Sequence, residues 1–152
     1  MPEQIIISDA SPLIALVDIG ELEILRKLYQ NITITDIVRN EIHAELPDWI
    51  IVSQNYDPKQ VKVLELELDA GEASAIALGL NTPTSTLILD EIKGRKVAKR
   101  LGLTVTGTIG IIVKAKNQGL IKSGREILGS LERHGFWLSH KLKAEILRQM
   151  DE

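Results

Sequence analysis

Short apolar runs rich in β-branched residues alternate with segments of helical period along this chain, and this alternation constrains the fold more than any other feature. The runs cover residues Gln4–Ser8, Ile32–Thr35, Thr86–Leu89 and Leu103–Thr106. Strands that alternate with helices are typical of a parallel sheet with crossover helices. The sequence therefore predicts an α/β fold. Residues Trp49–Val52 are a further candidate strand, at an edge of the sheet.

Several predicted helices have recognisable start signals. Ser11 followed by Pro12 predicts an N-cap with proline at the first helical position, where its missing N–H costs nothing. Asp36 is the predicted cap of the next helix. Asp69, with Glu72 three residues later, resembles a capping box. If Ser11 caps its helix, Asp9 has no obvious local task.

The last third of the chain is predicted to be helical. A helix runs from Ile109 to Lys116 and ends at Gly119, and two more follow Ser123, with a break near Gly135. A length of 152 residues with 44% hydrophobic content suits one core, so we expect a single domain over residues 1–152. Its motifs lie in residues 4–122, and residues 123–152 form a helical end.

Composition narrows the cellular setting and the chemistry. The chain has no cysteine, which excludes disulfides, thiolate zinc sites and a catalytic Cys, and fits a reducing compartment such as the cytoplasm. No basic leader precedes the first apolar run, and no apolar stretch reaches the roughly 20 residues of a membrane span. We therefore expect a cytoplasmic protein without a membrane segment.

Any nucleic-acid contact is expected to be local, because the net charge is −3 and aromatic residues make up only 3% of the chain. Trp49 and Trp137 are expected to be core or interface anchors and not base-stacking residues. The predicted helix after Asp90 carries a basic surface that could guide an RNA backbone, although a solvated helix face explains it equally well. The basic residues are Lys93, Arg95, Lys96, Lys99 and Arg100.

A Gly-Thr-Ile-Gly turn lies where the last predicted strand passes into a helix. Thr108, in this turn, could offer its N–H to a phosphate. Close helix packing explains the two glycines equally well.

Acidic residues follow two of the predicted strands. In an open parallel sheet the ligand site lies beyond the carboxyl ends of the strands, where Asp9 and Asp90 are expected. Asp9 could also be a turn residue, and Asp90 could be an N-cap. Glu91 could be a further ligand or simply lie favourably in a first helical turn.

Two glutamates lie on predicted helices near buried faces. Glu41 lies one step from the stripe of Val38 and Ile42, so it could point into a cleft or be an ordinary boundary residue. Glu72 shares a face with Ile76, but the capping box accounts for it as well. Several carboxylates at one edge would repel one another unless a cation compensates. Oxygen ligands alone favour Mg²⁺ or Mn²⁺, and such an ion suits hydrolysis of a phosphodiester.

The order of these motifs resembles the PIN domain, and in particular the small PIN-like proteins related to toxin ribonucleases of toxin–antitoxin pairs. The resemblance covers roughly residues 4–122. The matching stretches are Ser8-Asp9-Ala10-Ser11-Pro12-Leu13-Ile14, Ile37-Val38-Arg39-Asn40-Glu41-Ile42, Gly71-Glu72-Ala73-Ser74-Ala75-Ile76-Ala77-Leu78, Leu87-Ile88-Leu89-Asp90-Glu91, Gly107-Thr108-Ile109-Gly110 and Gly119-Leu120-Ile121.

The resemblance implies a three-layer α/β/α fold, a homodimer and a Mg²⁺ or Mn²⁺ site that cleaves RNA, with an antitoxin protein as a partner. It assigns Asp9, Glu41, Glu72 and Asp90 as metal ligands and catalytic acids, with Ser11 as an outer hydroxyl. Two features depart from the better-studied toxins: Glu72 replaces the usual Asp, and Asp90 is not preceded by a Thr-rich turn.

Three hypotheses about function are consistent with these motifs. The first is a metal-dependent endoribonuclease that uses these acids, with Glu91 as an additional ligand. The second is a catalytically inactive PIN-fold protein that binds a partner protein and uses its acids as helix caps. The third, phosphotransfer, has little support, because Asp9-Ala10-Ser11 lacks the second Asp of a DxD motif.

Overall fold

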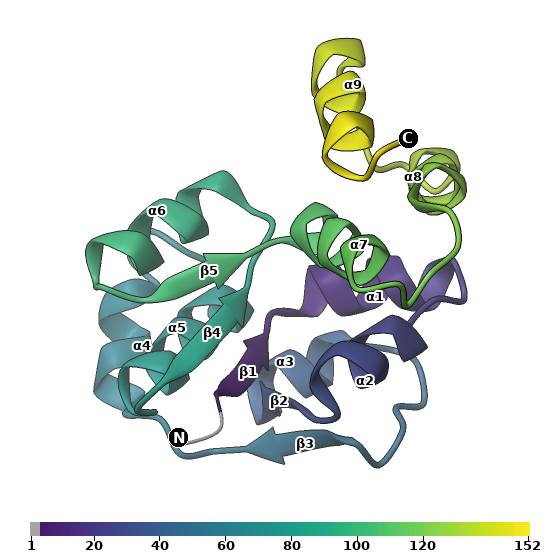
Figure 1. Ribbon diagram of the computed structural model, residues 1–152. Coiled ribbons are helices and arrows are strands. Elements are labelled where there is room, and N and C mark those ends of the chain that lie inside the picture. The colour runs from purple at the N-terminus through teal and green to yellow at the C-terminus, as the bar shows by residue number, and fades with distance from the viewer. Residues whose placement is uncertain (1–3) are drawn as a thin grey trace.

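The computed structural model of this chain describes residues 4–152. Within this range a single sheet has five strands, all parallel: β1 (Ile5–Ser8), β2 (Ile32–Thr35), β3 (Ile50–Ser53), β4 (Ser85–Ile88) and β5 (Thr104–Thr106). Their spatial order is β3-β2-β1-β4-β5. Helices cover both faces of the sheet (Figure 1). The predicted α/β/α fold with a parallel sheet is confirmed.

The described helices match the predicted alternation. They are α1 (Ala10–Asp18), α2 (Glu23–Tyr29), α3 (Asp36–Glu41), α4 (Pro58–Leu64), α5 (Ala70–Leu80), α6 (Ile92–Arg100), α7 (Thr108–Asn117), α8 (Gly124–Arg133) and α9 (His140–Gln149). The five predicted strands are found, each with its ends displaced by no more than about one residue, which is within the usual uncertainty of such boundaries. The candidate strand Trp49–Val52 is β3, and it does lie at an edge.

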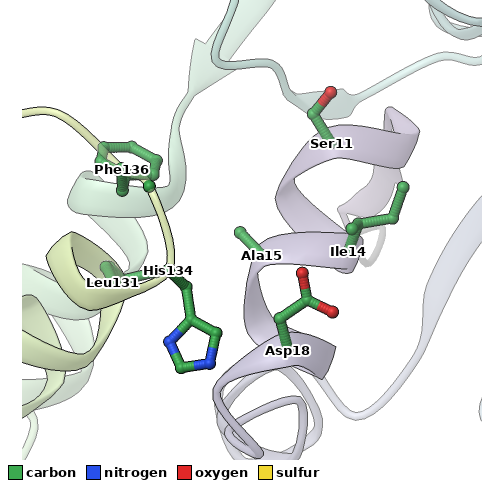
Figure 2. A pocket seen from close by; sticks show the side chains of 8 residues that line it. Ser11, Ile14, Ala15, Asp18, Leu131, His134 and Phe136 are labelled. Atoms are coloured by element: carbon green, nitrogen blue, oxygen red, sulfur yellow. The ribbon is translucent and has the colours of Figure 1, made fainter.

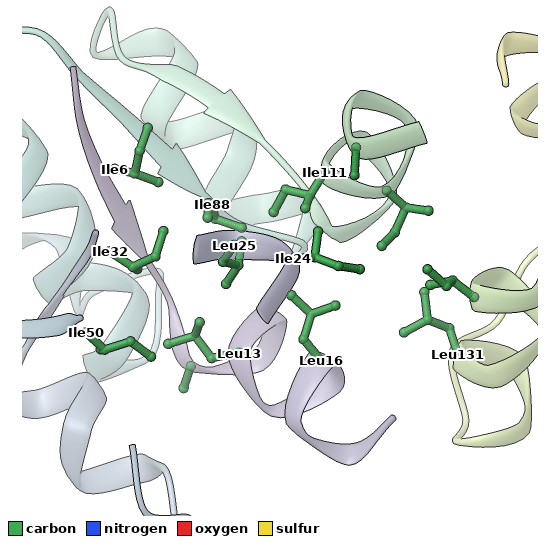
Figure 3. Close-up of a cluster of buried hydrophobic side chains, with 14 of the residues drawn as sticks. Ile6, Leu13, Leu16, Ile24, Leu25, Ile32, Ile50, Ile88, Ile111 and Leu131 are labelled. Atoms are coloured by element: carbon green, nitrogen blue, oxygen red, sulfur yellow. The ribbon is translucent and has the colours of Figure 1, made fainter. Parts of the chain in front are cut away.

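The strands divide the core into two layers, because successive side chains of a strand point to opposite faces of the sheet. Ile6 of β1 packs in a cluster with Leu13 of α1 and Ile111 of α7, which Figure 3 shows. Ile7 packs in a second cluster with Ile76 of α5. Both faces of the sheet are therefore buried, as the β-branched character of the strands predicts.

Helix α5 is the most closely packed helix of the second layer. Every residue from 71 to 79 is buried, and most of them are small. A Cβ added at Gly79 would lie 2.7 Å from Leu87 Cδ1 of β4, so only glycine allows this close approach. The close approach carries Glu72, in the first turn of α5, into the protein.

Two predicted helix caps are wrong. Helix α1 begins at Ala10, so Ser11 lies inside the first turn and does not cap it. Thr35, rather than Asp36, caps α3, because its hydroxyl accepts a hydrogen bond from Val38 N at 3.0 Å. In both places the strand passes into the helix with almost no loop, so the cap falls one or two residues earlier than the sequence signal.

Other predicted helix features are confirmed. Asp69 caps α5, with its carboxylate accepting from Glu72 N at 2.9 Å. The C-terminal end consists of two helices that break at Gly135, whose φ of +97° favours glycine. On α9 Ile146 is buried, as is Met150 at its C-cap, but Leu142 is 47% exposed.

Among residues 4–152 no helix combines the length and apolar character that a membrane span requires.

Candidate functional site

The chain order reverses at the centre of the sheet, and this reversal defines a site. From β1 the chain runs outward through β2 and β3 on one side, and through β4 and β5 on the other. In open α/β sheets, ligands bind at the carboxyl ends of the strands where this reversal occurs. Asp9 directly follows β1 and Asp90 lies just beyond β4, so both lie at this position.

A pocket of about 240 Å³ opens at this edge, and we call it the acidic pocket. It lies between the start of α1, the segment before α5 and the start of α6. Of the residues predicted for the site, Asp9, Ser11, Glu72, Glu91 and Lys93 meet here. The complete lining is Asp9, Ser11, Glu67, Leu68, Asp69, Glu72, Glu91 and Lys93.

Asp9 occupies the N-cap position of α1, but its side chain makes no capping hydrogen bond. The residue is only 5% exposed, and its Oδ1 has no hydrogen-bond partner among the described residues. Asp9 thus lacks a local structural task, as predicted, although the reason given for this prediction, a cap by Ser11, is wrong. A buried carboxylate oxygen without a partner costs free energy.

Burial raises the pKa of Asp9 to about 7, and the backbone N–H of Ala10 opposes this only in part. The nearby carboxylates of Asp69, Glu41 and Asp90 raise the pKa further. Asp9 therefore changes its charge close to neutral pH, whereas an ordinary aspartate is fully ionised there.

Glu72 is the second buried carboxylate of the acidic pocket. It is 5% exposed, and its Oε2 also lacks a partner among the described residues. A Cβ added at Gly94 of α6 would lie 2.6 Å from this oxygen, so the missing side chain at Gly94 makes room for it. Burial raises the pKa of Glu72, and the charges of Asp69 and Asp9 act in the same direction.

Asp69 is an acid for which the sequence predicts only a capping role. It lines the acidic pocket, and its charge raises the pKa values of Asp9, Glu41 and Glu72. One sequence feature could have indicated that Asp69 lines the site: it directly precedes α5, a buried helix that packs on the sheet. Because the cap accounts for Asp69 completely, the local pattern indicates no further role.

Glu41 does not line the acidic pocket, although its charge acts on Asp9. It is the last residue of α3, and its carboxylate lies over Gly71, where a Cβ would collide with it. Burial raises its pKa, the charge of Asp69 adds to this, and the N–H of Gly71 lowers it. Glu41 therefore contacts the start of α5 without lining the pocket that Glu72 lines.

Asp90 is fully engaged by α7. Its Oδ1 accepts from Thr108 N at 2.8 Å, and its Oδ2 accepts from Thr108 Oγ1 at 2.5 Å. Thr108 is completely buried, so contact with an RNA phosphate would require Asp90 to release it. Arg95 Nη1 donates to Leu89 O at 2.8 Å, which holds this guanidinium against the backbone beside Asp90. A Cβ at Gly107 would lie 2.8 Å from both Arg95 Nη1 and Asp90 Oδ1.

The remaining predicted residues are exposed; Ser11, Glu91 and Lys93 line the acidic pocket, and Lys96 does not. Glu91 is the N-cap of α6 without a capping bond, and it is exposed, as are Lys93 and Lys96. Lys93 reaches the acidic pocket, where its ammonium group supplies positive charge. Ser11 is exposed and also lines the pocket.

The acids do not form a complete metal cage in this arrangement. In the part of the chain that the structure describes, no group of three or more His, Asp and Glu side chains is placed so that it could hold a metal ion. The donor chemistry nevertheless fits a hard divalent cation, because Asp9 and Glu72 both line this pocket and each has a buried oxygen without a partner among the described residues. A cation there would offset the cost of burying both charges.

The fold and the site together place this chain among small α/β proteins with an acidic site. Its parallel sheet lies between helical layers, and carboxylate oxygens without partners among the described residues lie where the chain order of the sheet reverses. The profile of the PIN domain family (DUF3368) matches residues 5–152, and the chain belongs to this family. PIN domains are typically nucleases and usually bind divalent metal. No curated protein and no solved structure matches the chain.

Proposed function

We propose that this protein is a Mg²⁺- or Mn²⁺-dependent endoribonuclease that hydrolyses RNA at the acidic pocket. The observation that carries the proposal is the pair of buried carboxylate oxygens, Asp9 Oδ1 and Glu72 Oε2, that have no partner among residues 4–152. Buried polar groups in folded proteins almost always have partners, and exceptions concentrate at functional sites.

The proposal assigns roles to five of the six charged residues that line the acidic pocket. Asp9 and Glu72 would hold the ion, with Asp69 and Glu91 at the same pocket completing the negative charge. The bound ion would polarise the phosphodiester and lower the pKa of an attacking water. The pKa of about 7 belongs to Asp9 without the ion, and a bound cation would lower this pKa and keep the carboxylate ionised as a ligand. Lys93 would face the phosphate at the rim.

Asp90 and Glu41 have positioning roles in this proposal. Asp90, just beyond the carboxyl end of β4, fixes the start of α7 through Thr108. Glu41 closes over Gly71 and supports the start of α5, which carries Glu72. Asp90 would bind the ion directly only if it released Thr108, and Glu41 only if it moved away from Gly71.

The first test is calorimetric titration with Mn²⁺ of the wild type, Asp9→Asn and Glu72→Gln. Loss of a ligand should weaken binding by more than the roughly 10- to 100-fold that second-shell changes cost. Asp48→Asn is the matched control, because Asp48 precedes β3 and lies at the opposite edge of the sheet. Wild type that is folded but binds no Mn²⁺ would refute the metal site.

RNA cleavage is tested separately on proteins that bind the ion. Asp9→Asn should abolish metal-dependent cleavage of single-stranded RNA, and Asp48→Asn should leave it unchanged. Metal binding without cleavage of any RNA from a mixed cellular pool would limit the proposal to metal binding.

A second candidate function is a catalytically inactive partner-binding protein. The observation that favours it is the use of acids to fix helix starts: Asp69 caps α5, and both oxygens of Asp90 bind Thr108. In metal-free buffer at pH 8, Asp9→Asn should stabilise the protein if crowded charge dominates. Asp90→Asn should destabilise the protein by about 1 kcal/mol if the acids serve mainly to fix helix starts.

The partners belong to the same proposal. A toxin ribonuclease would form a homodimer in the cytoplasm and bind an antitoxin protein that restrains it. Sedimentation at several protein concentrations tests the homodimer. Co-expression with the product of a neighbouring reading frame tests the antitoxin, because a true antitoxin would block RNA cleavage by the wild type.

A further inference from the structure

A second pocket adjoins the acidic pocket, and we call it the α1–loop pocket. It has a volume of about 250 Å³ and lies between the exposed face of α1 and the segment that ends α8 (Figure 2). Ser11 lines both pockets, so the two meet at the start of α1. The lining of the α1–loop pocket is Ser11, Ile14, Ala15, Asp18, Leu131, His134, Gly135 and Phe136.

The loop after α8 holds two of the five aromatic residues of this chain. Phe136, the only phenylalanine, lines the α1–loop pocket. Trp137, the next residue, is 82% exposed, whereas Trp49 is 8% exposed. An exposed tryptophan beside an open pocket gains nothing for folding. Aromatic rings of this kind stack on unpaired bases, with a contribution that does not depend on base identity.

The polar groups of the pocket accept hydrogen bonds. His134 Nδ1 lies 2.9 Å from Ser130 O, and because a carbonyl can only accept, this nitrogen is the donor. In the neutral ring Nε2 is then left as an acceptor. The Asp18 carboxylate is a second acceptor at the same pocket (Figure 2). The pocket therefore suits a ligand with a flat apolar body and N–H donors at its edge.

We propose that the α1–loop pocket holds an unpaired RNA base next to the scissile phosphate and favours guanine. Stacking on Phe136 supplies affinity, and the Asp18 carboxylate accepts the two adjacent N–H donors of the guanine Watson–Crick edge. Uracil offers a single such donor. This inference deepens the proposed ribonuclease function and rests on it for the adjoining phosphate.

The spacing along α1 suits a neighbouring nucleotide. Helical residues rise about 1.5 Å each, so the step from Asp9 to Ala15 covers roughly 9 Å. The phosphate at the acidic pocket and the base at the α1–loop pocket would then belong to one nucleotide or to adjacent ones. Ser11, between the two pockets, lies where the sugar would pass.

The test uses Trp137 as the reporter. Trp49→Phe leaves Trp137 as the only tryptophan. Adding Asp9→Asn removes one charge and the proposed hydrolysis, so base binding is measured whether or not the protein is an enzyme. This double variant is titrated with hexauridylate and with a uridine hexamer that carries one guanosine, in Mg²⁺ buffer.

We expect both RNAs to quench Trp137 emission, with tighter binding of the guanosine-containing hexamer. In the same background, Phe136→Ala should weaken both affinities by roughly 5- to 100-fold, the usual range for loss of a stacked base. Asp18→Asn should abolish the preference for guanosine while leaving hexauridylate affinity equal or higher. Asp48→Asn, at the opposite sheet edge, should preserve the preference.

Three results would overturn the base-binding proposal. The first is no quenching by either RNA, and the second is equal affinities for Phe136→Ala and its parent. The third is a change in Trp137 emission with protein concentration alone, which would mean that a second copy of the chain covers the pocket. If RNA binds as expected while the wild type cleaves none, the pocket stands and the proposed hydrolysis fails.

Discussion

Two regions of this protein place carboxylates beside helix starts, and they differ in how those carboxylates are satisfied. At the start of α8, Glu152 Oε2 accepts from Gly124 N at 2.7 Å and Oε1 from Ser123 Oγ at 3.1 Å, and Lys116 Nζ lies 3.7 Å from Oε2. At the acidic pocket, Asp9 Oδ1 and Glu72 Oε2 have no partners among residues 4–152.

The pKa values follow this difference. Burial acts to raise the pKa of Glu152, but the donors of Gly124, Ser123 and Arg125 together with the charge of Lys116 outweigh it, and the net pKa is lowered. At the acidic pocket, burial is reinforced by neighbouring acids, and the pKa of Asp9 rises to about 7. The comparison shows that partners, more than burial itself, decide whether a carboxylate stabilises the fold or needs a cation to offset its charge.

The largest expected effect is the pH dependence of stability in metal-free buffer. The folded-state pKa of Asp9 is raised, so the folded form holds a proton that the unfolded form releases above about pH 4. The unfolding free energy should therefore fall as pH rises, by on the order of 3 kcal/mol from Asp9 between pH 5 and pH 8. Urea unfolding in EDTA at several pH values measures this.

Asp9→Asn is the control for that pH dependence, since an amide does not titrate. The variant should show a flatter profile and higher stability than wild type at pH 8. A wild-type stability that stays constant or rises from pH 5 to pH 8 would contradict a raised pKa.

The next largest effect concerns packing at the start of α8, the region where the Glu152 carboxylate has hydrogen-bond partners. A Cβ at Gly124 would collide with Met150 Sδ, which is held in a buried position. We expect Gly124→Ala to lower the unfolding free energy by about 1–3 kcal/mol through overpacking. Thermal unfolding measures this, and Gly129→Ala in the same helix is the control, because its nearest neighbour is the flexible end of Arg133 at 3.3 Å.

A smaller effect is expected from the cap of α8. Ser123 accepts from Glu126 N at 3.1 Å and donates to Glu152, so Ser123→Ala should cost about 1 kcal/mol. Metal affinity at the acidic pocket should not change. If Ser123→Ala weakened Mn²⁺ binding as strongly as Glu72→Gln, the two regions would not be independent.

The smallest effect belongs to the ion pair between Lys116 and Glu152. At 3.7 Å and with both side chains partly exposed, it should contribute less than about 1 kcal/mol. Lys116→Gln should lower stability only slightly, and the difference from wild type should shrink in high salt. Chemical unfolding at low and high ionic strength checks this.

Much of the fold and some of the site could be predicted from sequence. The strand runs, the edge position of β3 and the burial of Glu72 follow from local periodicity, and all are found. The pairing of Asp90 with Thr108 could not be predicted, because it joins residues 18 apart across two elements. Asp69 is recognisable as a cap but not as a pocket residue, because that role depends on where α5 lies.

The loop after α8, which holds Phe136 and Trp137, also shows what the sequence alone could not predict. The sequence predicts that Trp49 and Trp137 are core or interface anchors; Trp49 is buried in the core, whereas Trp137 is exposed, which excludes a core role and leaves the interface role as a prediction. The exposure of Trp137 and the pocket beside it depend on how α8 and α9 diverge at Gly135. No local pattern marks that divergence as the wall of a pocket.

Local sequence is enough to establish the alternation of strands and helices and to place Asp9 and Asp90 just after β-strands, because hydrophobic period and strand ends are local properties. Which carboxylates have partners is instead a property of the packed chain. Asp90 accepts a hydrogen bond from Thr108, and Glu152 accepts one from the start of α8. Asp9 Oδ1 and Glu72 Oε2 have no such donor among the described residues. Hydrogen bonds between distant elements depend on packing, and in this protein that packing leaves unsatisfied carboxylates at the reversal point of the sheet.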